Sequence, residues 1–422
     1  MSRSFHPATF IVTGLIWLFL STAVGCALLL ADAHGIGLSL DLRQVHGHAA
    51  LVGGAIQIIM GLWFIPIAGE RPRADSRPGI YFAINFGTVG MLLGFGIGQP
   101  LLVGAFSVLA IGAMLALFKH IPSHAALNIP RGLTRWWYGT ALTALSLGLA
   151  LGEGMAWKLV PHEHLGWVKV AHAHLTVVGF MLLALIGLTY WLLPAITESL
   201  QFHAVWTRII WLVMPLGAII LAFGLAASSF VSQISGGILL MLGVGLYACD
   251  LARQRIRDEY GRFPRAVPLL RIAGGYLGIT ALSGIALAVN ALWLPPPVRI
   301  GQWHLLAYAH LFYLGFAVHH LFGLLTGLLP LVLAKARSRS HKKRKPIHAE
   351  LIALMERGTS IQLGILNLGI MGLVAMASLV WWVPLKSPLI PVAAWTSAAL
   401  LLIPWPLFLF NAIVVLRTPA RP

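Results

Sequence analysis

Long apolar runs, separated by short stretches with charged residues, Pro or Gly, follow one another along the whole chain of 422 residues. A helix of about 20 apolar residues crosses the hydrocarbon core of a bilayer. The pattern therefore predicts an all-α polytopic membrane protein with twelve transmembrane helices in a single integral membrane domain, residues 1–422. The predicted spans are residues 8–31, 45–69, 80–98, 101–118, 136–156, 168–193, 205–227, 230–250, 268–294, 302–334, 361–383 and 388–416.

The composition supports this assignment, because the chain is far more apolar than a soluble protein. Hydrophobic residues make up 59% of the sequence and charged residues 10%, and the mean hydropathy is +0.86. A soluble domain of this length could not bury so much apolar surface, so we expect the lipid bilayer to be a principal partner. The chain contains no Cys-x-x-Cys-His motif, which excludes a covalently attached c-type heme.

The Lys and Arg residues behind the net charge of +17 are concentrated in the predicted loops on one side of the membrane. Only five of the 29 Lys and Arg residues lie in the loops of one side: Arg43, Lys158, Lys169, Arg299 and Lys386. Cytoplasmic loops carry the excess of Lys and Arg in membrane proteins, so we expect both termini in the cytoplasm and the chain in the inner (cytoplasmic) membrane. This bias explains the net charge without a nucleic-acid partner.

A pattern anchored on histidine recurs in the second, sixth and tenth predicted spans. Counted from His48, His174 and His310, glycine recurs at +5 and +13, and proline follows at +18 or +20. This register predicts three pseudo-symmetric four-helix repeats. The repeats cover about residues 1–130, 131–262 and 263–422. The shared positions are Gly53, Gly61 and Pro66; Gly179, Gly187 and Pro194; and Gly315, Gly323 and Pro330.

Histidines within membrane spans are rare, cost free energy and mark functional sites. A hydrogen-bonded structural histidine is the alternative for any single residue, but a set that repeats in register favours ligands. We expect the repeat histidines to form a ring at one depth, close to the periplasmic face. The candidates are His46, His48, His172, His174, His310, His319 and His320.

The spacing within His46-Gly-His48 and His172-Ala-His174 narrows the chemistry. Residues i and i+2 of an α-helix point about 200° apart, so two such histidines cannot hold one small ion together. They can instead face two planar macrocycles on opposite sides of the helix, each of which needs an axial imidazole. A heme with two histidines suits electron transfer, whereas a heme with one keeps an open position for a small ligand.

The adjacent His319 and His320 lie two to three turns deeper than His310. Three interpretations stay open for them: binding of a copper ion, relay of protons, or hydrogen bonds that only satisfy the two rings.

Residues 170–194 resemble the tenth helix of subunit I of the heme-copper oxidases. The resemblance rests on Val170-Ala-His172-Ala-His174, on Gly179 and on the closing Tyr-Trp-Leu-Leu-Pro. The glycine at +5 is most similar to the cbb-type and nitric oxide reductase branch, and the twelve-helix plan is also similar to the NnrS proteins of the nitrite and nitric oxide response.

The resemblance implies heme b, a cytochrome or quinol electron donor, other subunits of a respiratory complex, and binding or reduction of NO or O2. It implies His48 and His310 as axial ligands. This chain departs from the family in the seventh span, residues 205–227, which lacks the histidines that bind copper at that place in the family. It departs again at Tyr308, which stands where the first histidine of the tenth span is expected. Whether the chain is an enzyme, an oxidoreductase of the terminal oxidase or nitric oxide reductase kind, therefore stays open.

The leading hypothesis is a heme-binding membrane redox protein. A transporter of metal ions or protons is one alternative, because intramembrane histidines and repeats occur in both. A non-catalytic membrane anchor subunit of a larger respiratory complex is the other.

Overall fold

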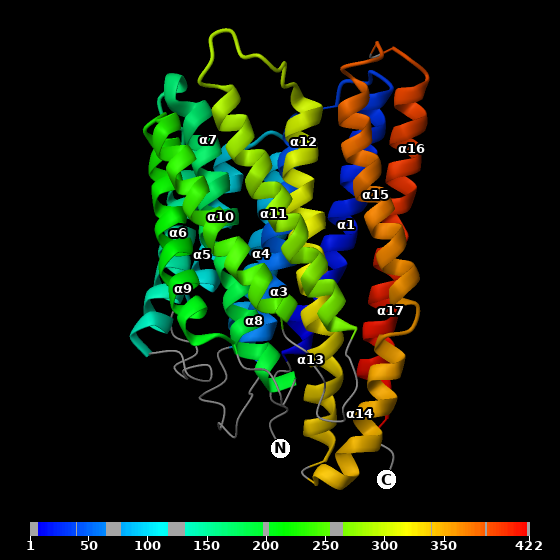
Figure 1. Ribbon diagram of the computed structural model, residues 1–422. Coiled ribbons are helices and arrows are strands. Elements are labelled where there is room, and N and C mark those ends of the chain that lie inside the picture. Colours follow the sequence, from blue (N-terminus) through cyan, green and yellow to red (C-terminus); the bar gives the residue numbers. More distant parts are fainter. Residues whose placement is uncertain are drawn as a thin grey trace.

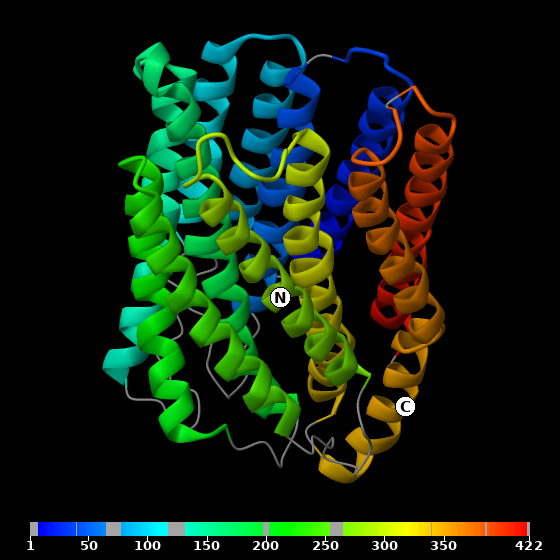
Figure 2. The same cartoon turned by 45° about the horizontal axis from the view of Figure 1, so that its top comes forward.

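The computed structural model describes residues 7–38, 40–64, 77–116, 131–196, 202–253, 265–338, 340–384 and 386–419. All regular structure in these residues is helical, and the helices run side by side along one axis (Figures 1 and 2). The prediction of an all-α, polytopic membrane protein is confirmed. Pro66 of the predicted repeat pattern lies outside the described residues.

The helices follow the order of the predicted spans. The first group is α1 (Ala8–Ala33), α2 (Leu40–His48), α3 (Gln57–Trp63), α4 (Arg77–Gly96) and α5 (Pro100–Leu115). The second is α6 (Arg131–Ala156), α7 (Leu165–His174), α8 (Leu183–Ile196), α9 (Ala204–Ala226) and α10 (Phe230–Arg253). The third is α11 (Ala266–Asn290), α12 (Gln302–His310), α13 (His319–Arg337), α14 (His341–Met355), α15 (Thr359–Leu379), α16 (Leu389–Leu402) and α17 (Pro404–Arg417).

Ten helical segments of the described residues are long and apolar enough to cross a membrane. The fourth and fifth predicted spans correspond to α5, which has 16 residues, and to α6, which has 26; both are helical, but neither is among the ten. The count of twelve crossings therefore stays a prediction. The sequence pattern did not predict α14, a short helix that carries much of the basic loop after α13.

Three of the ten segments form the inside of the bundle. In their most apolar stretches, 67% of the residues of Asp41–Trp63, 83% of His162–Pro194 and 94% of Gln302–Arg337 are buried, against 22–44% in the other seven. A helix that is apolar on all sides is buried by protein on all sides. These three segments, the central helices, carry the repeat histidines, and the remaining helices shield them from lipid.

Both ends of the described chain lie at the same end of the bundle. The first residues of α1 and the last residues of α17 lie in the lower half of Figure 1, and α17 packs against α14. The basic run Lys342–Lys345 lies in α14 at this same end. The repeat histidines lie toward the opposite end, because α2, α7 and α12 descend from the top.

Each central helix contains a π-helix that begins directly after a repeat histidine. The three π-helices are Ala49–Ile56, Leu175–Leu182 and Leu311–Val318, eight residues each. They follow His48, His174 and His310, and each contains the glycine at +5. π-helices account for well under 1% of residues in proteins and concentrate at functional sites. Their recurrence at three aligned positions marks the three histidine segments as structurally equivalent.

Close packing between α9 and α10 provides a test of the fold. A Cβ atom added at Gly236 would lie 2.5 Å from the backbone nitrogen of Leu221. We expect Gly236→Leu to lower the melting temperature, by the equivalent of about 1–3 kcal/mol, because backbone atoms cannot move aside as side chains can. Thermal unfolding of the purified protein in detergent measures this. The control is Gly245→Leu in the same helix, where an added Cβ atom meets no atom within 4 Å; equal melting temperatures would contradict the packing.

Candidate functional site

Two pairs of histidines face each other across the gaps between the central helices. His46 of α2 faces His310 of α12, with ring centres 6.0 Å apart and ring planes at 10°. His48 of α2 faces His172 of α7, with centres 6.2 Å apart and planes at 25°. The two histidines of α2 therefore point to different neighbours, as the i, i+2 spacing predicts. The structure pairs His310 with His46 and His48 with His172; the sequence had left the pairing open.

The separation within each pair matches a shared metal between opposed imidazoles. Rings in face-to-face contact lie about 3.5–4 Å apart, so rings whose centres are 6.0 and 6.2 Å apart are not in face-to-face contact. A metal–imidazole bond is about 2 Å long, and a ring nitrogen lies about 1 Å from the ring centre. Two imidazoles that bind one metal through opposed nitrogens thus have centres about 6 Å apart. Both pairs have this spacing.

Hydrogen bonds fix which ring nitrogen is available. The Nδ1 atom of His46 donates to the carbonyl oxygen of Ser21 over 2.8 Å, and Nδ1 of His172 donates to the carbonyl oxygen of Gly148 over 2.6 Å. Both carbonyls belong to the preceding outer helices, α1 and α6. A ligand histidine typically donates its other N–H to a carbonyl in this way, which orients the ring and its lone pair.

The second histidine of each motif is tethered within its own helix. Nδ1 of His48, His174 and His310 donates to the carbonyl oxygen four residues earlier, over 2.9, 2.9 and 2.8 Å. Among the described residues, no hydrogen bond reaches Nε2 of these three rings or of His46 and His172. In all five rings, Nε2 is therefore the nitrogen left to bind a ligand.

Glycines of the outer helices make room for the first histidine of each pair motif. A Cβ atom at Gly25 would lie 2.6 Å from Cε1 of His46, and one at Gly152 would lie 3.0 Å from Cε1 of His172. Each glycine follows the tethering residue by four positions, Ser21 before Gly25 and Gly148 before Gly152. Residues i and i+4 share one helix face, so a single face of α1 or α6 both holds and admits the ring.

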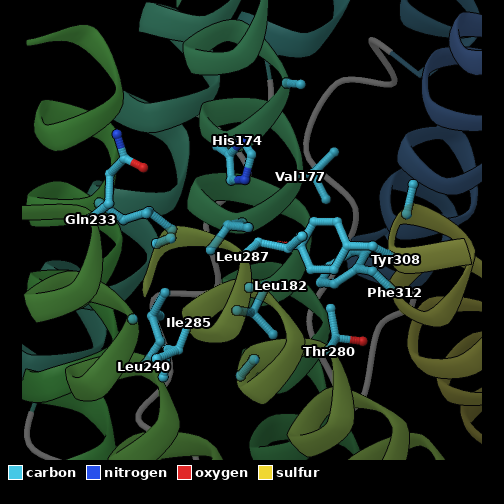
Figure 3. Close-up of a pocket in the computed structure, with 18 of the residues that line it drawn as sticks. His174, Val177, Leu182, Gln233, Leu240, Thr280, Ile285, Leu287, Tyr308 and Phe312 are labelled. Atoms are coloured by element: carbon cyan, nitrogen blue, oxygen red, sulfur yellow. The ribbon is translucent and has the colours of Figure 1, made fainter. Parts of the chain in front are cut away.

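Among the described residues, no histidine pairs with His174, which instead borders a cavity. This cavity of about 370 Å³ lies between α7, α10, α11 and α12, and its wall is mainly apolar. Figure 3 shows the His174 ring and the Tyr308 ring projecting into it from two different helices.

His319 and His320 are fully buried and face different helices. His319 donates from Nδ1 to the carbonyl oxygen of Leu314 over 2.8 Å and accepts from the Asn367 amide over 3.2 Å. Nε2 of His320 lies 3.0 Å from the carbonyl oxygen of Leu185 and 2.6 Å from the Thr189 hydroxyl. The described residues contain no group of three or more His, Cys, Asp or Glu that could hold a metal ion. The copper interpretation gains no support here. Hydrogen bonds satisfy both ring nitrogens of His319, whereas among the described residues Nδ1 of His320 has no hydrogen-bond partner.

The sequence did not reveal which histidines pair, because each pair joins helices from different predicted repeats. Gly25 and Gly152 also went unrecognised. Their signal is visible in retrospect, since each lies on an odd-numbered predicted span that packs against a histidine span of the same repeat.

A structural role of His319 can be tested through its neighbour. Asn367 donates to His319 and accepts from the Tyr276 hydroxyl over 2.6 Å, so Asn367→Leu leaves two polar groups without partners. We expect a loss of about 1–3 kcal/mol in stability, measured by thermal unfolding in detergent. Thr396→Val, at an exposed position, is the control. An unchanged melting temperature would show that this hydrogen-bonded unit does not hold the helices together.

No protein-family model matches this chain, and no curated protein matches it. The function is therefore inferred from its own residues. These provide two pairs of facing histidines with ring centres 6.0 and 6.2 Å apart, and a third gap in which a histidine borders a cavity.

Proposed function

We propose that this chain is an integral membrane redox protein that binds b-type heme at the two histidine pairs and passes electrons between them. The observation that carries the proposal is the repeated geometry: two imidazole pairs at 6.0 and 6.2 Å, each ring held by Nδ1 and offering Nε2. Two unrelated helix pairs would not share this arrangement by hydrogen-bond satisfaction alone.

The residues fit the group in three respects. Each pair supplies two neutral nitrogen ligands from opposite sides, which is the demand of a six-coordinate heme iron. Each ring is oriented by a carbonyl oxygen, as in other metal-binding histidines. Each site lies among apolar helices, which suit the faces of a porphyrin and limit the access of water.

When bound, heme supplies a reversible one-electron couple. The protein determines where these couples lie. Because His46 and His48 belong to the same helix, a single helix, about 10 Å in diameter, separates the two sites. A shared helix of this thickness places the two sites side by side at one depth of the membrane, so we infer that electrons pass between them.

The π-helices and the pairing pattern support three four-helix repeats. In both pairs, the first histidine of one motif meets the second histidine of a motif on another central helix. The three π-helices then repeat at the same distance from the second histidine. A common ancestor unit explains both regularities.

The rival hypotheses differ in what they require. A metal-ion transporter needs several ligands converging on one ion, and the described residues contain no group of three or more such side chains. A membrane anchor subunit is compatible with the same two sites, so we extend the proposal to a cytochrome or quinol donor and to other subunits of a respiratory complex. We place the chain in the cytoplasmic membrane, with the heme sites near the periplasmic face.

The pairing predicts an unusual mutational pattern. His46→Ala and His310→Ala should each remove the same single heme per chain, and the double variant should remove no more, because both rings bind one iron. His48→Ala and His172→Ala should behave likewise for the second heme. Pyridine hemochromogen content and low-spin EPR signals measure this. His162→Ala, in an exposed turn, is the control. Additive losses within a pair, or a wild-type protein without heme, would refute the proposal.

Gly25 and Gly152, the glycines that leave room for the His46 and His172 rings (the glycine seats), give an independent test. Gly25→Val should displace the His46 ring and abolish heme at that pair, while the other pair keeps its heme; Gly152→Val should do the opposite. The control is Gly112→Val, where an added Cβ meets no atom within 4 Å. Heme content and redox-titration amplitude separate the two sites. The proposal fails for a pair that keeps its heme when its seat is filled.

A further inference from the structure

The three central helices meet at three gaps, and histidine pairs occupy only two of them. The gap between α2 and α12 contains His46 and His310, and the gap between α2 and α7 contains His48 and His172. The third gap lies between α7 and α12. There, His174 extends from α7, and Tyr308 extends from α12 in place of a second histidine (Figure 3).

Tyr308 occupies the position that His46 and His172 occupy in the other two motifs. It precedes His310 by two residues, just as His46 precedes His48. The hydroxyl oxygen of Tyr308 would lie 3.0 Å from a Cβ atom added at Gly284 of α11. Gly284 is thus the third glycine seat, on the outer helix that precedes α12, as Gly25 and Gly152 precede their own motifs.

The equivalence extends to the tethering positions. Thr280 lies four residues before Gly284, as Ser21 and Gly148 lie four residues before the other two glycines. Thr280 also lines the cavity. The third gap therefore has the same framework as the two paired gaps, and it differs in one ligand position.

The cavity at the third gap has the size and chemistry of a binding site. Its volume of about 370 Å³ falls within the range of small-molecule sites. Its wall is mainly aliphatic and aromatic, and its few polar side chains include His174, Tyr308, Gln233 and Thr280. Among the described residues, no hydrogen bond uses Nε2 of His174, and its ring borders the cavity, whereas the rings of the two pairs face a partner ring.

We propose that the third gap binds a heme through His174 alone, and that the side facing Tyr308 is an open coordination position for a small uncharged diatomic ligand. This inference rests on the proposed function of the two pairs. Tyr308 does not replace the missing imidazole. A phenolate without a cation is costly in an apolar cavity, and no Lys or Arg is among the described residues that line it. Tyr308 therefore keeps its proton, which it can donate in a hydrogen bond to the bound ligand.

The two kinds of gap then have different tasks. A heme with two histidines has no free position and serves electron transfer, whereas a heme with one histidine accepts an exogenous ligand. His172 and His174 belong to one helix, so the open site neighbours the His48–His172 pair just as the two pairs neighbour each other.

Carbon monoxide tests the open site, because it binds reduced heme only where a position is free. In the full-length protein purified in detergent and reduced, we expect one of three hemes to respond to CO. His174→Ala should remove the CO response and one heme, while the low-spin signals of both pairs persist. The matched control is His162→Ala, which should change neither.

Two substitutions at Tyr308 test the same site without removing its ligand. Tyr308→Phe should preserve heme content and CO binding but increase the CO dissociation rate several-fold, because the hydrogen-bond donor is lost. Tyr308→His should complete a third pair on the seat of Gly284, so that heme is retained and the CO response disappears. These variants remain informative if His174→Ala does not fold.

The outcomes separate this inference from the proposed function. Heme at both pairs, without any CO-sensitive fraction, overturns the open site and leaves the redox protein standing. A CO response that survives His174→Ala, or a bound quinone that is lost in that variant without loss of heme, also overturns it. A wild-type protein without heme refutes both proposals.

Discussion

A hydrogen bond from Nδ1 to a backbone carbonyl oxygen orients every histidine in the gaps between the central helices. In a bilayer, a polar ring nitrogen without a partner is costly, so one nitrogen of each ring must be satisfied by the protein. The carbonyls of Ser21 and Gly148 satisfy it from a neighbouring helix, and the carbonyls four residues earlier satisfy it within α2, α7 and α12. Once Nδ1 is held, the direction of Nε2 is fixed, and with it the spacing across each gap.

The close approach of the helices follows from the same requirement. A neighbouring carbonyl can reach His46 or His172 only where the outer helix lies against the ring, and only glycine leaves room there. Small residues allow this approach between membrane helices. The π-helices begin directly after the second histidine of each motif, so the altered helical turn and the oriented ring occur together in all three central helices.

Much of this architecture could be predicted from the sequence. The features that follow from local periodicity were predictable, whereas those that depend on packing between distant helices were not. The spans, their order and the opposite directions of His46 and His48 follow from local periodicity, which a sequence displays directly. The partners of these rings depend on how helices distant in the chain pack, and local patterns do not encode that. The resemblance to heme-copper oxidases implied His48 and His310 as axial ligands, and the structure separates them into different pairs. The adjacent His319 and His320 illustrate the same limit, because their side-chain hydrogen-bond partners, Asn367 and Thr189, lie on other helices.

The phenol at position 308 changes the connectivity of the whole assembly. With an imidazole there, all three gaps would contain a histidine pair, and no gap would differ from the others as an end point for electron transfer. One aromatic hydroxyl breaks that symmetry. In the proposed arrangement, electrons follow a linear path through two hemes with two histidine ligands each, and the path ends at the heme that binds a diatomic gas.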